Sequence, residues 1–276
     1  MSRFRFVRTP AGACGVALLT FVVLVALIGP YFAGHSPAAS IGVPFAGPGD
    51  GVPFGTDGLG RDALARTLWG GRSVLGLAGL ATLLAYLAGA GIGLVAGYRQ
   101  GLADALLMRA VDVVVAVPAL LFILVLVTGA GTSDGTLVTA VAVVQAPLIA
   151  RVVRSATLEQ SVRAFVEAAV ARGERARAIL LREIVPNIVP SVMADAGLRL
   201  TYSIILVASV NFFGLGLQPP AADWALMISE NRDGFDLNPW VIIAPATMIA
   251  LLTIAVNLTG DALARSLGRS DAGAGS

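Results

Sequence analysis

The stretch EAAVARGERARAILLREIVPNIVP, Glu167 to Pro190, decides how the chain has to be read, because it does not match its surroundings. The whole chain is 57% hydrophobic and only 13% charged, with a mean hydropathy of +0.83. Within this stretch, however, arginines and glutamates are interleaved with apolar residues. The apolar positions recur every three or four residues, which is the spacing of one face of an α-helix. We therefore expect an amphipathic helical segment that lies outside a largely apolar body.

The rest of the chain is dominated by apolar runs. A transmembrane α-helix needs about 20 predominantly apolar residues. Six runs approach that length, at residues 11–33, 73–98, 110–128, 136–153, 190–217 and 239–260. An average globular domain carries about a quarter charged residues, far more than this chain. We therefore predict an all-α polytopic membrane protein, in which residues 1–276 form a single transmembrane domain of six transmembrane helices.

The arginines orient the predicted spans. The chain has no lysine, so its 19 basic residues are all arginine. If the N-terminus is cytoplasmic, most of them fall in inside segments. Those that fall outside are Arg61, Arg66, Arg72 and Arg232. Because positive residues concentrate on the cytoplasmic side of membrane proteins, we expect a multi-pass protein of the cytoplasmic membrane with both termini cytoplasmic.

Composition also excludes several classes of function. A P-loop and a protein kinase each need a lysine at the phosphates of ATP, so this chain carries neither kind of ATP site. One cysteine, Cys14, and one histidine, His35, are too few for a structural zinc or an iron–sulfur cluster. The arginines lie at the ends of apolar runs rather than in one patch, which does not indicate a nucleic-acid partner. We expect no catalytic residue, no cofactor and no metal in this chain.

The predicted outside segments combine turn residues with acids. The extracytoplasmic segment 34–72 is rich in proline and glycine until Thr56 or Asp57, either of which could cap a short helix from Arg61 to Trp69. A second outside segment covers residues 218–238. Its acids are Asp223, Glu230, Asp233 and Asp236. A solvated loop explains these acids, and an acidic docking surface is the alternative interpretation.

Several residues inside the apolar runs have two interpretations. Gly89, Gly93 and Gly97 form a smooth strip on one helix face, which is typical of close helix packing. Asp195 and Arg199 are one turn apart and can pair. We expect both to reach the membrane interface, although intramembrane charges also mark functional sites. Three amides are predicted to lie deeper: Gln145, Asn211 and Asn257. Each could line a translocation pathway or join helices, and joining helices is the commoner use.

The longest predicted cytoplasmic loop is 154–189. Its apolar stripe consists of Phe165, Val166, Ala169, Val170, Gly173, Ala176, Leu180 and Ile184. Gly173 falls midway, where a left-handed backbone conformation would divide the stripe into two short helices. The stripe could lie on the lipid surface, but glutamates interrupt it and many of its residues are small. Since the chain has no ATP site, we favour docking onto a soluble partner.

This segment resembles a known element. Glu167-Ala168-Ala169, Gly173 and Ile184-Val185-Pro186 are similar to the EAA loop of ABC importer permeases, which docks into a groove of a cytoplasmic ATPase. Other stretches resemble the C-type permease of dipeptide and oligopeptide importers, a subfamily that also includes nickel permeases. They are FGTDGLGRDALARTLWGGRS (54–73), FFGLGLQPPAADWALMI (212–228) and NLTGDALARSL (257–267). Val185 and Ala65 replace the leucine and serine that are frequent in the family, so no role of that serine is carried over.

The resemblance implies a type I ABC importer permease fold and a cytoplasmic coupling loop at 154–189. It assigns ATPase coupling to Glu167, Ala168, Ala169, Arg172, Gly173, Ile184 and Pro186. In that assignment a hydrogen bond or ion pair fixes Glu167, the two alanines permit close contact, and Gly173 makes the turn.

The resemblance also implies partners and a substrate. The partners are a homologous B-type permease, two cytoplasmic ABC ATPases that bind ATP and magnesium, an extracytoplasmic substrate-binding protein and membrane lipid. We therefore predict a non-enzymatic permease subunit that translocates dipeptides or oligopeptides. A permease for a nickel chelate or another small solute is the alternative. A secondary transporter is less favoured, because it would need inverted repeats and mid-membrane ion ligands.

Overall fold

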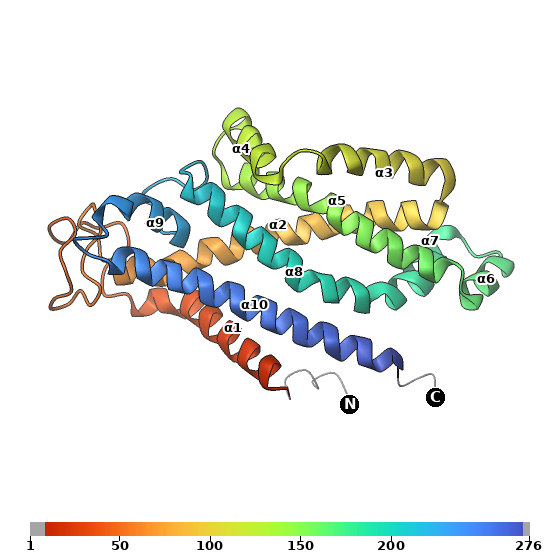
Figure 1. The fold of residues 1–276 in the computed structure, drawn as a ribbon, viewed down its shortest axis with the longest axis horizontal. Helices are drawn as coiled ribbons and strands as arrows, with labels where there is room; N and C mark the ends of the chain where they lie inside the picture. Colours follow the sequence, from red (N-terminus) through yellow and green to blue (C-terminus); the bar gives the residue numbers. More distant parts are fainter. Residues whose placement is uncertain (1–8, 273–276) are drawn as a thin grey trace.

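Long apolar helices define the architecture and run roughly side by side along the long axis of the molecule (Figure 1). The computed structural model describes residues 9–272. Its α-helices are α1 (Pro10–Ile28), α2 (Ala63–Arg99), α3 (Gly101–Val115), α4 (Ala119–Ala130), α5 (Asp134–Ser161), α6 (Ala164–Ala171), α7 (Ala176–Ile179), α8 (Val185–Phe212), α9 (Trp224–Asn231) and α10 (Trp240–Ala272). Short 3-10 helices cover Gly29–Phe32 and Arg232–Gly234, and a π-helical turn covers Leu180–Ile184. Within residues 9–272 no strand forms, and isolated bridges link only loop residues and the cap of α2. The prediction of an all-α protein is confirmed.

Helix length and composition give five to six candidate membrane spans. Five stretches qualify alone: Pro10–Phe32, Ala63–Arg99, Asp134–Ser161, Ala176–Phe212 and Trp240–Ser266. The pair α3 and α4 also qualifies, but it is bent by 82°. Pro118 caps α4 at this bend, and proline lacks a backbone N–H and disfavours helix in the residue before it. The run predicted at 110–128 is therefore two helices rather than one. By contrast, Pro147 and Pro245 lie inside unbroken helices.

The glycine strip of α2 packs against α5. A Cβ on Gly89 would lie 2.5 Å from the carbonyl oxygen of Ala146, and one on Gly93 would lie 2.6 Å from that of Ala150. At Gly97 the nearest atom would be Thr157 Cβ, at 2.7 Å. Only glycine allows so close an approach of the two backbones. The prediction of close helix packing is confirmed.

The first turn of α2 differs from the prediction. Neither Thr56 nor Asp57 caps a helix; Asp62 does, because its side chain accepts hydrogen bonds from the N–H groups of Leu64 and Ala65. The helix does not end near Trp69 but continues unbroken to Arg99. The predicted short outer helix is thus the beginning of the longest helix in residues 9–272, since no proline or cap interrupts the sequence after it.

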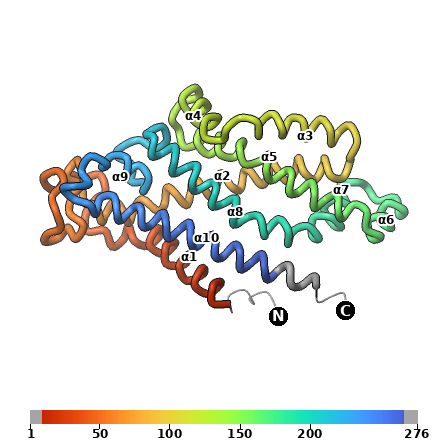
Figure 2. Tube along the Cα trace, viewed as in Figure 1, coloured from red at the N-terminus to blue at the C-terminus, as the bar shows by residue number. Residues whose placement is uncertain are grey.

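The two ends of the molecule are built differently. The loops that precede α2 gather with α9 at one end, which we call the outer end, while α6 and α7 project at the opposite, inner end (Figure 2). One hydrophobic cluster, containing Trp224 and Met227, extends through the middle of the bundle toward the outer end. A second cluster, containing Ile149 and Ile184, anchors the inner end.

Candidate coupling segment and translocation groove

The inner end carries two short helices that form the coupling segment, defined here as residues 163–184. Gly173 separates α6 from α7 with φ +74°, the left-handed conformation that the sequence predicted at this position. The backbone N–H groups of Gly173 and Glu174 donate to the carbonyls of Val170 and Ala169, which closes the end of α6. After α7, the π-helical turn leads directly into α8. The segment therefore has a defined local geometry and runs directly into a candidate span.

Part of the segment is buried in the protein's own core. The residues concerned are Val166, Ala169, Ile179 and Ile184, which pack with Ile149 and Val153 of α5. Ala169 and Ile184 have no exposed surface, so they can position the segment but cannot touch a partner. The predicted stripe is also narrower than expected, because Phe165 and Val170 are exposed.

The remaining predicted coupling residues are exposed on the other side. They are Glu167, Ala168, Arg172, Gly173 and Pro186. Arg172 pairs with Glu174 at 2.6 Å, with more than half of the arginine side chain exposed. Within residues 9–272 the three arginines Arg175, Arg177 and Arg182 have no ion-pair partner. The segment thus presents small residues surrounded by unpaired positive charge.

All three predicted deep amides make hydrogen bonds within the chain. The Gln145 side chain is buried and donates to the carbonyl of Arg199 at 2.8 Å and to Ser203 Oγ at 3.1 Å, so it joins α5 to α8. Asn211 Oδ1 instead accepts from the N–H of Leu217 at 3.0 Å and shapes the loop after α8. Asn257 donates to Thr253 on its own helix.

The charged pair in α8 lies inside the bundle. Arg199 Nε donates to both carboxylate oxygens of Asp195, at 3.1 and 2.9 Å, as the spacing predicted. The two side chains are only 11% and 12% exposed, so they are largely covered by the protein itself, and their position at the membrane interface stays a prediction. The hydroxyl of Tyr86 in α2 donates to Asp195 at 3.0 Å and holds the pair against the neighbouring helix.

The outer end contains a buried cluster of four charges, which we call the outer ion cluster: Asp57, Arg61, Arg66 and Glu230. Asp57 Oδ2 accepts from Arg61 and from Arg66, each at 2.6 Å. Glu230 lies 2.9 Å from the same two guanidinium groups. Burial raises the pKa of the Glu230 carboxyl above its usual range, and the charge of Asp57 raises it further while Arg61 opposes the shift. The cluster ties the segment before α2 to α9.

The region 218–238 is therefore not a solvated loop. Asp223 and Trp224 are fully buried, and Asp223 caps α9. The indole N–H of Trp224 donates to the carbonyl of Thr67 at 2.7 Å. Burial raises the pKa of the Asp223 carboxyl, although a hydrogen bond from Ser73 opposes the shift. Of the predicted acids, Asp233 and Asp236 remain exposed.

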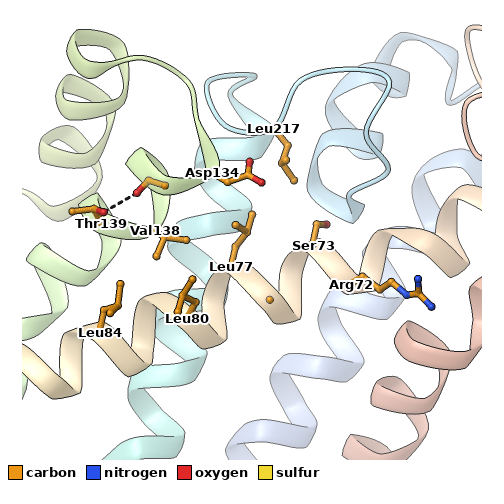
Figure 3. Close-up of a pocket in the computed structure, with 11 residues that line it drawn as sticks. Arg72, Ser73, Leu77, Leu80, Leu84, Asp134, Val138, Thr139 and Leu217 are labelled. Carbon is orange, nitrogen blue, oxygen red and sulfur yellow. Dashed lines mark hydrogen bonds between the residues drawn. The ribbon is translucent and has the colours of Figure 1, made fainter.

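A groove of about 540 Å³ opens between α2, α5 and the loop after α8. Its walls are mainly Leu77, Leu80, Leu84, Val138 and Leu217. Figure 3 shows the Asp134 carboxylate beside Leu217 and the guanidinium of Arg72 turned away from the other lining residues. That guanidinium donates to the carbonyls of Ala26 and Leu27 instead. None of Gln145, Asn211 and Asn257 lines the groove.

Known proteins match this chain over most of its length. A family model described as "Binding-protein-dependent transport system inner membrane component" matches residues 89–270. The glutathione transport system permease protein GsiD of Pectobacterium atrosepticum is 38% identical over 80% of this chain and 73% of that protein. The oligopeptide transport system permease protein OppC of Haemophilus influenzae is 32% identical over 97% and 87%, respectively. The dipeptide transport system permease protein DppC of Alkalihalophilus pseudofirmus is 31% identical over 92% and 84%.

A solved structure supports the fold. A chain of the MetNI methionine ABC transporter, described in inward-facing conformations, aligns with a TM-score of 0.58 at 16% identity. The alignment covers 74% of this chain and 96% of that chain. The helical architecture, the short helices at the inner end and the sequence matches agree with one another. This chain belongs to the family of inner membrane components of binding-protein-dependent transport systems, and it has the fold of a type I ABC importer permease.

Proposed function

We propose that this chain works as one of two permease subunits and that its coupling segment docks onto an ATPase subunit. The observation that carries the proposal is the two-sided character of the segment. One side is packed on α5, whereas Glu167, Ala168 and Arg172 are exposed on the other. Small exposed residues allow close approach of a partner, and the charges around them fix the register of docking.

The proposed partners are inferred from the ATP-binding site that this chain lacks. Without lysine it has no P-loop, so ATP and magnesium are bound by two cytoplasmic ATPases. Closure of those ATPases moves the docked segment as a rigid body, and α8 moves with it because the two are continuous. A second, homologous permease completes the pathway, and a binding protein delivers the substrate at the outer end.

The orientation in the membrane is part of the proposal. We place the coupling segment, the start of α1 and the end of α10 on the cytoplasmic side. The positive-inside rule supports this placement, since the exposed arginines of the segment lie at that end. In Figure 1, α1 starts and α10 ends away from the loops that surround α9.

The proposed substrate is a short peptide. Relatives of this chain are named for glutathione, dipeptide and oligopeptide transport. The groove between α2 and α5 is the candidate surface along which such a substrate passes, since it combines apolar walls with Asp134 and the hydroxyls of Ser73 and Thr139. A nickel chelate is the alternative substrate that a competition assay would detect.

The test is co-purification in mild detergent, followed by ATPase and uptake assays after reconstitution with the binding protein. Glu167→Lys reverses an exposed charge in the coupling segment, and we expect it to abolish uptake while the protein stays in the membrane. Asp50→Lys is the matched control, because Asp50 is also exposed but belongs to the outer loops, and it should retain the ATPase subunits. Normal ATPase binding and uptake in Glu167→Lys would refute the coupling role.

A further inference from the structure

Six polar residues meet between α2, α5 and α8, and we call them the interhelical cluster. They are Thr82, Tyr86, Gln145, Asp195, Arg199 and Ser203. Thr82 Oγ1 lies 2.8 Å from Ser203 Oγ, which also accepts from Gln145. Tyr86, Asp195 and Arg199 form a second set of bonded side chains, and Gln145 joins the first set to it through the backbone carbonyl of Arg199.

The cluster is not part of the groove. None of its six members lines that surface, and Ser203 and Gln145 are buried at 0% and 2% exposure. Its charged members face neighbouring helices of the same subunit rather than a solvent-filled space. A direct role in contacting substrate is therefore not supported.

Burying a charged pair among membrane helices is costly, and apolar side chains of similar size often stabilise a protein as well or better. A charged pair in such a place is therefore a candidate for setting helix register or for function. Here the Asp195 carboxylate has two donors on different helices: Arg199 on α8 and Tyr86 on α2. Because hydrogen bonds are directional, this geometry fixes how α8 is rotated and placed relative to α2.

The position of the interhelical cluster along α8 matters because the coupling segment joins the start of that helix. The coupling segment joins α8 through the π-helical turn Leu180–Ile184, and α8 is continuous from Val185 to Phe212. Asp195 and Arg199 are the first charged residues of α8 after that junction. A movement that enters α8 at its start thus reaches the interhelical cluster before it reaches the outer half of the bundle.

We propose that the interhelical cluster is the joint that carries movement of the coupling segment from α8 to α2 and α5, with Tyr86, Asp195 and Arg199 as positioning residues for transport. This inference rests on the proposed function. The Tyr86–Asp195 hydrogen bond adds a directional link to the apolar packing of α8 against α2, so that the two helices move together. Loss of the joint should leave ATP hydrolysis running while less of it drives transport.

The experiment measures uptake per ATP hydrolysed by the full reconstituted complex with a labelled dipeptide, normalised to assembled complex. Tyr86→Phe removes only the hydroxyl that reaches Asp195. Tyr98→Phe is the matched control, since Tyr98 lies on the same helix and its hydroxyl has no hydrogen bond within residues 9–272. We expect uptake per ATP to fall roughly 2- to 30-fold in Tyr86→Phe, the range of coupling changes found along such networks, and to stay unchanged in Tyr98→Phe.

A second variant removes the charges without leaving either one unpaired. The double substitution Asp195→Asn with Arg199→Gln should assemble normally and should lose uptake per ATP at least as strongly as Tyr86→Phe. If ATPase activity and uptake fall in the same proportion in both variants, the cluster is only structural and the inference is overturned. A wild-type complex that takes up no peptide would overturn the proposed function as well.

Discussion

The outer end and the coupling segment are both rich in charge, but they use it in opposite ways. At the outer end, Asp57, Arg61 and Arg66 are at most 3% exposed, and each pairs with an opposite charge within the same chain. In the coupling segment, Arg175 and Arg177 are exposed and have no ion-pair partner within residues 9–272. The number of charged residues in a stretch of sequence therefore does not show whether their side chains are free to bind a partner protein. What separates the two regions is whether opposite charges are brought together by the fold.

The same contrast extends to the backbone. Asn238 donates to the carbonyls of Ala46, Phe54 and Thr56, and so ties loops that are distant in sequence. The coupling segment has no comparable cross-link; a single left-handed glycine, Gly173, sets the angle between its helices. The outer end is thus fixed by many long-range hydrogen bonds, whereas the inner end is shaped by local backbone geometry and one apolar face.

The largest expected effect comes from breaking the outer ion cluster. Arg66→Met leaves Asp57 and Glu230 sharing one guanidinium in a buried place, and we expect it to lower the free energy of unfolding by about 3–5 kcal/mol. Thermal unfolding of the purified protein in detergent measures this loss. Arg66→Lys keeps the charge but not the forked geometry, and its loss should be smaller. Wild-type stability of Arg66→Met would show that the cluster contributes nothing to the outer end.

An intermediate effect on stability, with a large effect on transport, is expected at Gly173. Proline fixes φ near −65°, which is incompatible with the observed +74°, so Gly173→Pro should cost about 1–3 kcal/mol and abolish uptake. Asparagine tolerates the left-handed conformation, and Gly173→Asn should therefore keep most of the uptake. Equal uptake by the proline variant would mean that the angle between α6 and α7 is irrelevant to coupling.

The smallest effect is expected from exposed ion pairs at either end. Arg232 lies 3.7 Å from Asp233, and Arg172 pairs with Glu174. Because exposed pairs are screened by solvent, Arg232→Ala and Arg172→Ala should each change the free energy of unfolding by less than about 0.5 kcal/mol. If the exposed charges of the coupling segment bind an ATPase and those of the outer end do not, Arg172→Ala should still weaken retention of the ATPase subunits during purification. Arg232→Ala should not.

Features with a local physical origin could be predicted from the sequence. The positions of the apolar helices, the left-handed Gly173 and the Gly89–Gly97 packing strip each follow from a short stretch of residues. The bend between α3 and α4 was not predicted. One run was expected at 110–128 instead, because the sequence does not show whether neighbouring helices hold the two halves in line.

Features that depend on distant residues could not be predicted. The acids at Asp223 and Glu230 look solvent-exposed in the sequence, but their partners Ser73, Arg61 and Arg66 lie about 150 or more residues away. The contact of Tyr86 with Asp195 has the same origin, at a sequence separation of 109 residues. The spacing of residues along the sequence does not show which distant side chains will pair. The burial of the two outer acids and of the Tyr86–Asp195 contact is therefore seen only in the folded structure.

The unbroken length of α2 has a consequence for how the two ends communicate. Its 37 residues span about 55 Å at a rise of roughly 1.5 Å per residue, well beyond the about 30 Å of a hydrocarbon core. A rod of this length acts as a lever. If its inner end is held and it tilts by about 5°, its outer end is displaced by about 5 Å. A small angular change near Arg99 is thereby amplified into an opening the width of a side chain near Asp62.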